Sequence, residues 1–427
     1  MTEEFLHYIW KFKLFDVDSG VVSGESFEVI EPGTHNFDSG PDFLNARIKI
    51  EDTVWAGNVE IHIRSSDWFS HGHQNDMAYD NVVLHVVFVD DKPVRRKNDE
   101  LIPTLELNGK FSDALYNRYQ YFLSSRQWIP CEKFIHRAGR FIINNQLDRL
   151  LVERLEEKSE AVLDRLKVNG NNWEQTFYEF LARNFGFKVN STPFEMTAKS
   201  LPLIYLGKHK DNLLQIEAML FGQAGFLDEE VEDDEYYMKL GKEYLFLKKK
   251  FGLIPVDRHL WRFMRLRPSN FPTIRLSQFA NLIHRSSHLF SKLLGIEKFP
   301  DLIPLFDVSV SDYWQTHYTF GKESAKQSKK LGKSAVHLIM INTIIPFLFV
   351  YGKLKNEQKY IDRALIFLDQ LPGEFNAIIR KWEELGMSTR TAYNTQALLQ
   401  LKNAYCNRKR CLQCSIGNEL LKETVGK

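Results

Sequence analysis

The sequence predicts an α+β protein, with an N-terminal mixed α/β domain followed by a larger all-helical region. Two observations carry this prediction: strand-like segments fill roughly the first 125 residues, and apolar residues recur at every third or fourth position from about residue 140. A chain of 427 residues, with 44% hydrophobic and 26% charged residues, has a globular composition and is too long for one simple core. We expect three parts, residues 1–125, 126–330 and 331–427.

The strands of the first part are recognised by alternation and by the residues that end them. "FEVIEPG" reads as a strand that Pro32 and Gly33 terminate. "DFLNARIKI" and "VWAGNVEIHI" flank the polar residues Glu51 to Thr53, which suits a hairpin. "NVVLHVVFV" is almost continuously apolar, as expected for a strand covered on both faces. "LIPTLEL" predicts a further strand, followed by a helix that ends near Ser125.

The rest of the chain has a helical period. In "QLDRLLVERLEEKSEAVLDRL" the leucines recur at spacings of three and four, which predicts an amphipathic helix. The most apolar segment, residues 335–352, is about as long as a membrane span. It contains His337, Asn342, Thr343 and Pro346, so we expect a buried core helix and no membrane association.

Charge and cysteine content narrow the class of protein. The net charge of +1 gives no general attraction to nucleic acid, so any nucleic-acid surface must be a local patch. The start "MTEEFLHYIWKFKLF" is acidic and lacks the basic and apolar regions of a secretory leader, so we expect a cytoplasmic protein. With four cysteines and no leader, a disulfide scaffold is not expected.

The main candidate catalytic residues are Asp42, Glu60 and His62. Asp42 begins one predicted strand, and Glu60 and His62 lie two residues apart on the next, so these two share a face. Two carboxylates that converge on a hard cation, with a polar group beside them, can activate water and neutralise a phosphodiester. We therefore predict a site for Mg²⁺ or Mn²⁺ held by Asp42 and Glu60.

The strand register decides whether Asp42 joins the other two residues. If the chain folds back symmetrically about Asp52, Asp42 lies opposite His62. The apolar residues argue otherwise, because they occupy even positions in the first strand and odd positions in the second, and aligning them turns Asp42 away. A bulge at Gly57 would reconcile the two registers.

The pattern "PD" at 41–42 with "EIH" at 60–62 resembles the PD-(D/E)xK phosphodiesterase superfamily over the first quarter of the chain. The resemblance implies a βαβ-containing core, a divalent metal, and a nuclease or phosphodiesterase that acts on DNA or RNA. Asp42 then corresponds to the metal-binding aspartate, Glu60 to the second acid, and His62 stands where lysine is usual. A histidine can bind a metal or transfer a proton, but it carries no permanent charge.

Over nearly its whole length the sequence is similar to an uncharacterised bacterial family, domain-of-unknown-function family 2851. The stretches that carry this resemblance are "GPDFLNARIKI", "VEIHIRSSDW", "ARNFGFKVN", "FGQAGFL", "RLRPSNFPTIRLSQFA" and "CLQCSIGNELL". The resemblance implies no activity.

A second group of possible ligands follows the strand that carries Glu60. His71, His73 and Asp76 form a mixed nitrogen and oxygen set that suits a transition metal, although no helical HExxH motif is present. The alternative is a polar loop that enters a short helix, with the histidines in solvent. His85, alone on an apolar strand, fits a hydrogen-bonded core residue better than a ligand.

The cysteines have the spacing of a metal site. Cys406, Cys411 and Cys414 form C-x4-C-x2-C, and the fourth, Cys131, lies far upstream. Four thiolates can hold Zn²⁺ or a 4Fe-4S cluster, and such a site would tie the C-terminal segment back to the first domain boundary. Four reduced, partly buried thiols are the alternative.

One stretch combines arginines with aromatic residues. In "HLWRFMRLRPSNFPTIRLSQF" these arginines could bind phosphates while the aromatic rings stack on bases; they are Arg262, Arg265, Arg267 and Arg275. Packing within a helix and a turn, with the arginines paired to acids, is the favoured interpretation.

The sequence supports three candidate functions. The first is a divalent-metal-dependent nuclease or phosphodiesterase. The second is a non-catalytic scaffold that binds nucleic acid or protein on a degenerate nuclease-like domain, which the missing lysine and the register conflict favour. The third is a zinc-dependent hydrolase that uses His71, His73 and Asp76.

Overall fold

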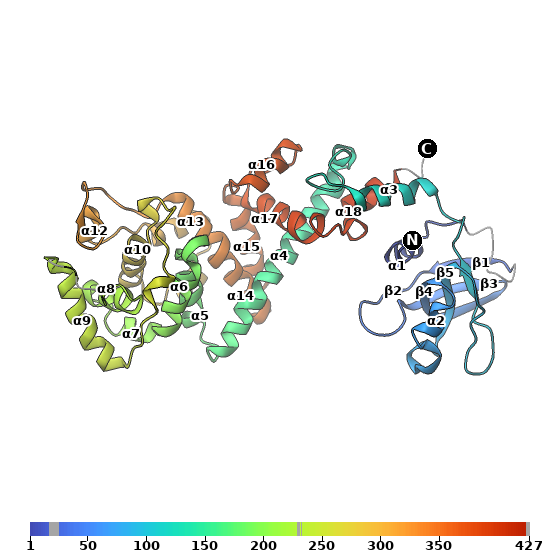
Figure 1. Ribbon diagram of the computed structural model, residues 1–427, viewed down its shortest axis with the longest axis horizontal. Coiled ribbons are helices and arrows are strands. Elements are labelled where there is room, and N and C mark those ends of the chain that lie inside the picture. The colour runs from blue at the N-terminus through green and yellow to red at the C-terminus, as the bar shows by residue number, and fades with distance from the viewer. Residues whose placement is uncertain (17–24, 229–230, 232, 424–427) are drawn as a thin grey trace. The chain divides into compact units, whose positions relative to one another are not determined.

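The computed structural model describes residues 1–16, 25–228, 231 and 233–423. Helices make up 57% of it and strands 11%, with a mixed sheet near the N-terminus and a larger helical region, so the predicted α+β class is confirmed. The chain divides into two compact units (Figure 1). The first consists of Met1–Gln146 and Leu401–Lys427, and the second of Leu147–Gln400. The boundaries predicted at 125 and 330 therefore fall inside these units.

The first unit is built on one mixed sheet with the strand order β1-β3-β4-β5-β6, and β2 pairs with β3 beside this path. The β1–β3 and β3–β4 pairs are antiparallel, whereas the β4–β5 and β5–β6 pairs are parallel. The strands are β1 (Phe27–Glu31), β2 (Thr34–His35), β3 (Phe43–Ile50), β4 (Thr53–Arg64), β5 (Val82–Val89) and β6 (Thr104–Glu106).

These strands match the alternation of the sequence. The predicted hairpin is present, with Glu51 in a left-handed conformation (φ 52°) between β3 and β4. Residues 82–87 of β5 are all buried, as predicted for a strand that is covered on both faces. Between β4 and β5 the chain forms α2 (Asp67–Ser70) and two short 3-10 turns, which allows the parallel connection.

Helix α1 (Glu3–Lys11) packs against β4. The Thr2 side chain accepts a hydrogen bond from the Phe5 backbone N–H and so caps the helix. Phe5, Ile9 and Trp10 are buried, whereas Glu3 and His7, four residues apart, are half-buried on one face. The unit also contains α3 (Asp113–Ser124) and α18 (Ser415–Lys422), which contact each other.

The register of β3 against β4 changes within the strand. Ala46 pairs with Gly57, but Phe43 pairs with Val59, so β3 holds one extra residue between these two pairs. Asn45, in this bulge, has φ 57°. The bulge predicted at Gly57 therefore lies across the hairpin, in β3. Beyond it the apolar face of β3 changes from even to odd positions, and both Phe43 and Val59 are fully buried.

The second unit is almost entirely helical. It contains most of α4 (Arg140–Val168) and a small hairpin of β7 (His317–Thr319) and β8 (Lys322–Glu323). Its other helices are α5 (Trp173–Phe185), α6 (Phe187–Ser200), α7 (Leu203–Gly207), α8 (Leu213–Gln223), α9 (Glu235–Phe251), α10 (Pro272–Arg285), α11 (Leu289–Gly295), α12 (Asp312–Thr316), α13 (Lys333–Ile339), α14 (Ile345–Lys355), α15 (Gln358–Gln370), α16 (Ala377–Glu384) and α17 (Ala392–Gln400).

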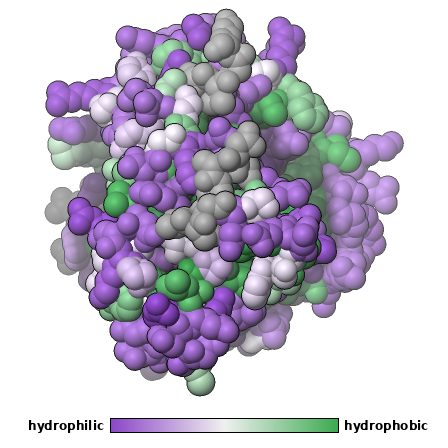
Figure 2. Space-filling view, turned by 90° about the vertical axis from the view of Figure 1, so that its right-hand side faces the viewer, coloured by the Kyte–Doolittle hydropathy of each residue, from purple (hydrophilic) through white to green (hydrophobic). Residues whose placement is uncertain are grey.

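The apolar segment predicted as a core helix forms a continuous helix from Lys333 to Lys355, which includes a π-helical turn at Met340–Ile344. Within the described chain it is the helix whose length and composition would suit a bilayer, and 78% of its apolar window is buried inside the protein. Figure 2 shows one face of the molecule, which is mostly hydrophilic with apolar side chains in small patches.

We predict that Gly57→Ala destabilises the sheet. A Cβ atom at this position would lie 2.4 Å from Cγ1 of Val83 and 2.7 Å from the backbone oxygen of Asn81. Both neighbours belong to packed backbone or core, so the free energy of unfolding should fall by about 1–3 kcal/mol.

The measurement is hydrogen–deuterium exchange of the β4 and β5 peptides, which reports on this sheet alone. Gly241→Ala is the matched control: it lies in α9 with no heavy atom within 4 Å of the added Cβ, and it should be neutral or stabilising. Unchanged protection of β4 in Gly57→Ala would contradict the prediction.

Candidate functional site

Asp42 lies beside Glu60, at the end of the hairpin beyond the bulge. Its backbone N–H donates to Oε2 of Glu60 (3.2 Å), and its own Oδ2 accepts from the backbone N–H of Ile61 (2.9 Å). The symmetric register had predicted His62 as its partner, which is wrong for two reasons: the hairpin pairs Ile50 with Thr53, one position away from that register, and the bulge moves the pairing by one more. The structure nevertheless gathers all three predicted catalytic residues at one corner of the sheet.

Glu60 and His62 point to the same face of β4, and His85 of β5 joins them there. The parallel register pairs Glu60 with His85. Nδ1 of His62 is 2.9 Å from Nε2 of His85, while Nε2 of His62 is 3.5 Å from Oε1 of Glu60. His62 is 1% exposed and Glu60 5%, so this is a buried polar cluster. His85 is fully buried and hydrogen-bonded, as predicted.

The loop after β4 adds His71 and His73. Nε2 of His73 is 3.3 Å from Oε1 of Glu60, and Nδ1 of His71 is 3.1 Å from Nε2 of His62. The ligand nitrogens of His62, His71 and His73 all lie within 4.8 Å of one another. The two predicted groups, one on the strands and one in the loop, are therefore a single cluster.

Asp76 is not part of this cluster. Its Oδ1 accepts a hydrogen bond from the backbone N–H of Ala78 and caps the 3-10 turn Met77–Tyr79. The loop set predicted as His71, His73 and Asp76 is thus corrected: the partners of the two histidines are Glu60 and His62 on the strand.

Helix α1 contributes two residues that the sequence analysis missed. Nε2 of His7 is 3.3 Å from Oδ2 of Asp42. Glu3 lies near enough to Asp42 and His71 for both to act on its carboxyl, whose pKa is raised by burial and by Asp42 and lowered by His71. The available signal was the spacing of four residues between Glu3 and His7 on an otherwise apolar helix.

The electrostatics of the cluster keep its buried histidines neutral. Burial, together with the neighbouring histidines, lowers the pKa of His62 to about 3, and burial does the same for His85. Burial also raises the pKa of Glu60, an effect that the neighbouring His73 opposes. Neutral imidazoles are the form that binds a metal ion.

The donor atoms have the spacing that a metal ion requires. Two ligands about 2.0–2.1 Å from a tetrahedral ion are about 3.3 Å apart; three donor pairs of the cluster are 3.1, 3.3 and 3.5 Å apart, and the three histidine nitrogens as a set lie within 4.8 Å of one another. If Nδ1 of His62 donates to His85, a lone pair on Nε2 of His62 faces the cluster, which is the usual way that an outer residue orients a ligand. The three imidazole nitrogens, with Glu60 in contact with two of these histidines, are the residues that could hold a transition-metal ion.

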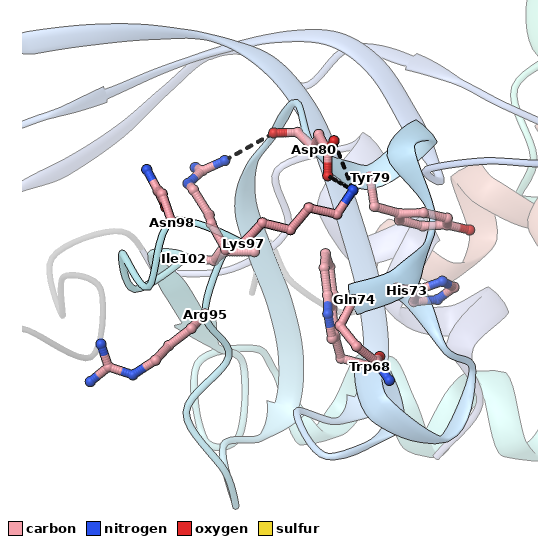
Figure 3. Close-up of a pocket in the computed structure, with 10 residues that line it drawn as sticks. Trp68, His73, Gln74, Tyr79, Asp80, Arg95, Lys97, Asn98 and Ile102 are labelled. Atoms are coloured by element: carbon pink, nitrogen blue, oxygen red, sulfur yellow. Dashed lines mark hydrogen bonds and ion pairs between the residues drawn. The ribbon is translucent and has the colours of Figure 1, made fainter.

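A cavity of about 260 Å³ adjoins the cluster at His73 (Figure 3). Trp68 and Tyr79 line it, and Tyr79 stacks on His73 with ring centroids 3.8 Å apart. Its rim is basic: Arg95, Arg96 and Lys97 line it from the loop after β5. In Figure 3 Lys97 reaches over the cavity to Asp80, with which it forms an ion pair (3.0 Å).

The arginine-rich stretch lies in the second unit and divides into two kinds of residue. Arg262, Arg265 and Arg267 are exposed. Arg275 is 7% exposed; it donates to Gln278 and Asn270 and lies 4.7 Å over the Phe187 ring. The prediction that Arg275 binds nucleic acid is corrected, because its guanidinium is used inside the helical unit.

The four cysteines all belong to the first unit, although Cys131 is distant in sequence from Cys406, Cys411 and Cys414. All are reduced, and all but Cys406 are buried.

One family model matches most of the chain. The family described as "Protein of unknown function (DUF2851)" matches residues 3–377, a range that includes α1, the sheet and the histidine cluster. This match confirms the family resemblance seen in the sequence. A search of the curated proteins and a search of the solved structures found no match.

We predict that the metal-free protein loses stability as the pH falls from about 6.5 to about 3. In this window the unfolded chain binds protons at His62 and His85, whereas the folded chain does not, because both pKa values are lowered to about 3. Each histidine then contributes up to about 1.4 kcal/mol per pH unit. Glu60 acts with the opposite sign, because its raised pKa favours the folded state at low pH.

Urea denaturation at pH 7, 6, 5 and 4 in the presence of a chelator measures this dependence. His85→Gln should reduce the slope by about one histidine's share. An identical slope in His85→Gln and the unmodified protein would contradict the assignment.

Proposed function

The chain belongs to the DUF2851 family of proteins of unknown function, and we propose that it is a divalent-metal-dependent nuclease, a phosphodiesterase that acts on DNA or RNA. The observation that carries the proposal is the convergence of Glu60, His62, His71 and His73 beside Asp42 at one corner of the sheet. The hairpin and the parallel strand β5 supply the kind of core that the PD-(D/E)xK resemblance implies.

The donor set indicates the class of metal. Three imidazoles and a carboxylate favour Mn²⁺, Zn²⁺ or another transition ion over Mg²⁺, which prefers oxygen ligands. Such an ion, when bound, supplies Lewis-acid polarisation of a phosphoryl oxygen. We therefore propose a histidine-rich metal site in place of the Mg²⁺ or Mn²⁺ site of two carboxylates that the sequence predicted.

Residues outside the donor set provide the remaining chemistry. Asp42 and His7 are in contact (3.3 Å), so His7 can accept or donate a proton while Asp42 orients its ring. Asp42 itself is fixed by the backbone N–H of Ile61. His62, which stands at the lysine position of the superfamily, belongs to the donor set, so the His7–Asp42 pair can supply the proton transfer instead.

The neighbouring cavity suits a phosphate-bearing substrate. Arg96 donates to the backbone oxygen of Asp80, and Lys97 donates to the Asp80 carboxylate. Both side chains line the cavity. A phosphate can compete with Asp80 for these donors because lysine and arginine bind phosphates by charge-assisted hydrogen bonds. The rim lies next to His73, so a polynucleotide held there has a phosphate within reach of the cluster.

We predict that Glu60→Gln abolishes both metal binding and cleavage. Calorimetric titration with Mn²⁺ and Zn²⁺ should show binding to the unmodified chain and at least about 100-fold weaker binding to the variant. Single-stranded DNA, duplex DNA and RNA are then incubated with each metal-loaded protein. Asp76→Asn is the matched control, because asparagine keeps the cap on Ala78 while it removes a charge from the same loop.

Cleavage by Glu60→Gln at the rate of the unmodified protein would exclude this site as the nuclease centre. Binding of nucleic acid without turnover in the metal-loaded, unmodified protein would instead support the scaffold function.

We further predict that Arg96→Ala with Lys97→Ala weakens nucleic-acid binding without changing its sequence preference. Each phosphate contact that is lost should reduce the salt dependence of log Kd by about one. Fluorescence anisotropy across a salt series measures both quantities. Arg47→Ala removes a charge from β3 beside Glu31 and serves as the control; an equal effect in both would exclude the rim as a specific contact.

A zinc-dependent hydrolase is the second candidate, and the three imidazoles favour it. Zinc-loaded protein that hydrolyses a small activated phosphodiester or ester but leaves DNA and RNA intact would select this function.

A further inference from the structure

The four cysteines of the chain occupy two segments of the first unit. Cys131 lies in a turn just before the short helix Ile135–Arg137. The other three follow one another through η8 (Leu401–Cys406), η9 (Cys411–Gln413) and the start of α18, where Cys414 precedes Ser415. None of them belongs to the histidine cluster described above.

Specific contacts join the two segments on both sides of the cysteines. The Lys402 ammonium donates to the backbone oxygen of Trp128 and stands 4.8 Å above its ring. The backbone N–H of Ser415 donates to Oε1 of Gln146 (2.9 Å). In addition, α18 contacts the helix Ile135–Arg137. Because these anchors flank Cys131 on one segment and Cys406 to Cys414 on the other, they bring the cysteines to the same place.

Tight turns of the backbone arrange the three C-terminal cysteines, Cys406, Cys411 and Cys414. Lys409, between Cys406 and Cys411, has φ 53°, which reverses the chain. The backbone N–H of Cys414 donates to the backbone oxygen of Cys411, so these two cysteines belong to one turn. Gly417 allows the close approach, since a Cβ there would lie 2.3 Å from the Cys411 oxygen.

The charges of the sulfur atoms act on one another. Burial raises the pKa of Cys406, and Cys131, Cys414 and Cys411 raise it further. These mutual effects agree with the anchors and turns that bring the two cysteine segments together. Lys402 and Lys409 act in the opposite direction on Cys406 and Cys411, so positive charge is available beside these thiolates.

We propose that this cluster is a structural metal centre with the thiolates of all four cysteines as its ligands. Thiolates select zinc or iron–sulfur clusters, and in proteins four thiolates hold each of these groups. Deprotonation on binding replaces mutual repulsion by attraction to the metal, and the lysines offset the remaining negative charge. The centre crosslinks the segment 128–146 to the segment 402–419 and holds the C-terminal part of the first unit in place.

The histidine cluster can also bind metal, so the test uses a background in which that site is disabled. Full-length Glu60→Gln/His71→Ala protein is purified without oxygen or chelators, and its zinc, iron and acid-labile sulfide are measured. We expect either about one zinc or about four irons with four sulfides per chain, and the latter also gives a visible charge-transfer absorption.

Cysteine variants in that background identify the ligands. Cys131→Ser and Cys414→Ser should each lower the metal content at least fivefold and lower the melting temperature. Ala404→Ser is the matched control, because it introduces the same hydroxyl at a buried position of the same segment and should keep the metal. Cys406→Ser should lower the metal content in the same way, and at the least buried of the four positions it disturbs the packing least.

A further measurement uses protein with all four cysteines, so that its result does not depend on whether the cysteine variants fold. Cobalt(II) added to the metal-free background protein should give the thiolate-to-cobalt absorption of a four-thiolate site. Less than one tenth of an equivalent of zinc and of iron in the anaerobic protein, together with no such absorption, would overturn the proposal. Metal retained in folded Cys131→Ser and Cys414→Ser would overturn it as well.

Discussion

The bulge in β3 is the constraint on which the candidate site depends. A strand places successive side chains on opposite faces, so one register cannot both bury the even positions of β3 and set Asp42 beside Glu60. The extra residue near Asn45 resolves this conflict, since Phe43 joins the apolar face and Asp42 turns to the polar one. The left-handed conformation of Asn45 costs about 1 kcal/mol, and asparagine tolerates it better than most residues.

The charge states of the histidines and carboxylates at this polar corner of the sheet are consistent with one another. Burial, reinforced by the neighbouring histidines, lowers the pKa of His62 and keeps it neutral, and burial does the same for His85. The carboxylates of Glu60 and Asp42 are then the source of negative potential, and they are also the nearest acceptors of the buried atoms His73 Nε2 and His7 Nε2, at 3.3 Å but outside hydrogen-bond geometry. A cation bound at this corner would satisfy both conditions at once, and this supports the proposed metal site.

Much of the fold was predictable from local patterns. Alternation located the β3–β4 hairpin and the buried strand β5, and helical spacing located the helices of the second unit. Asp42, Glu60 and His62 were found because carboxylates at the start and end of paired strands are conspicuous. Sequence could not place the bulge: Gly57 looked like its site, but that glycine is required by the close approach of Asn81 and Val83.

The remaining differences arise from tertiary contacts that leave no local signal. His71 and His73 lie beside Glu60 because a polar loop folds back over the sheet, and the sequence carries no signal for that fold. In the sequence, an aspartate that caps a turn cannot be told apart from an aspartate that binds a metal, so the role of Asp76 could not be predicted. His7 lies beside Asp42 because helix α1 packs against β4. Arg275 was indistinguishable from its exposed neighbours until the burial of its helix was known.

The discontinuous first unit has a consequence for how the protein is made. Its sheet is complete after roughly the first hundred residues leave the ribosome, but residues 401–423 arrive only after the whole second unit has been synthesised. During that interval the surface that will receive α18 is uncovered, and the second unit can fold first as an insertion. Closing so long a loop adds only a modest entropic penalty. Synthesis of α18, rather than of the sheet, is therefore the step that allows the first unit to be completed.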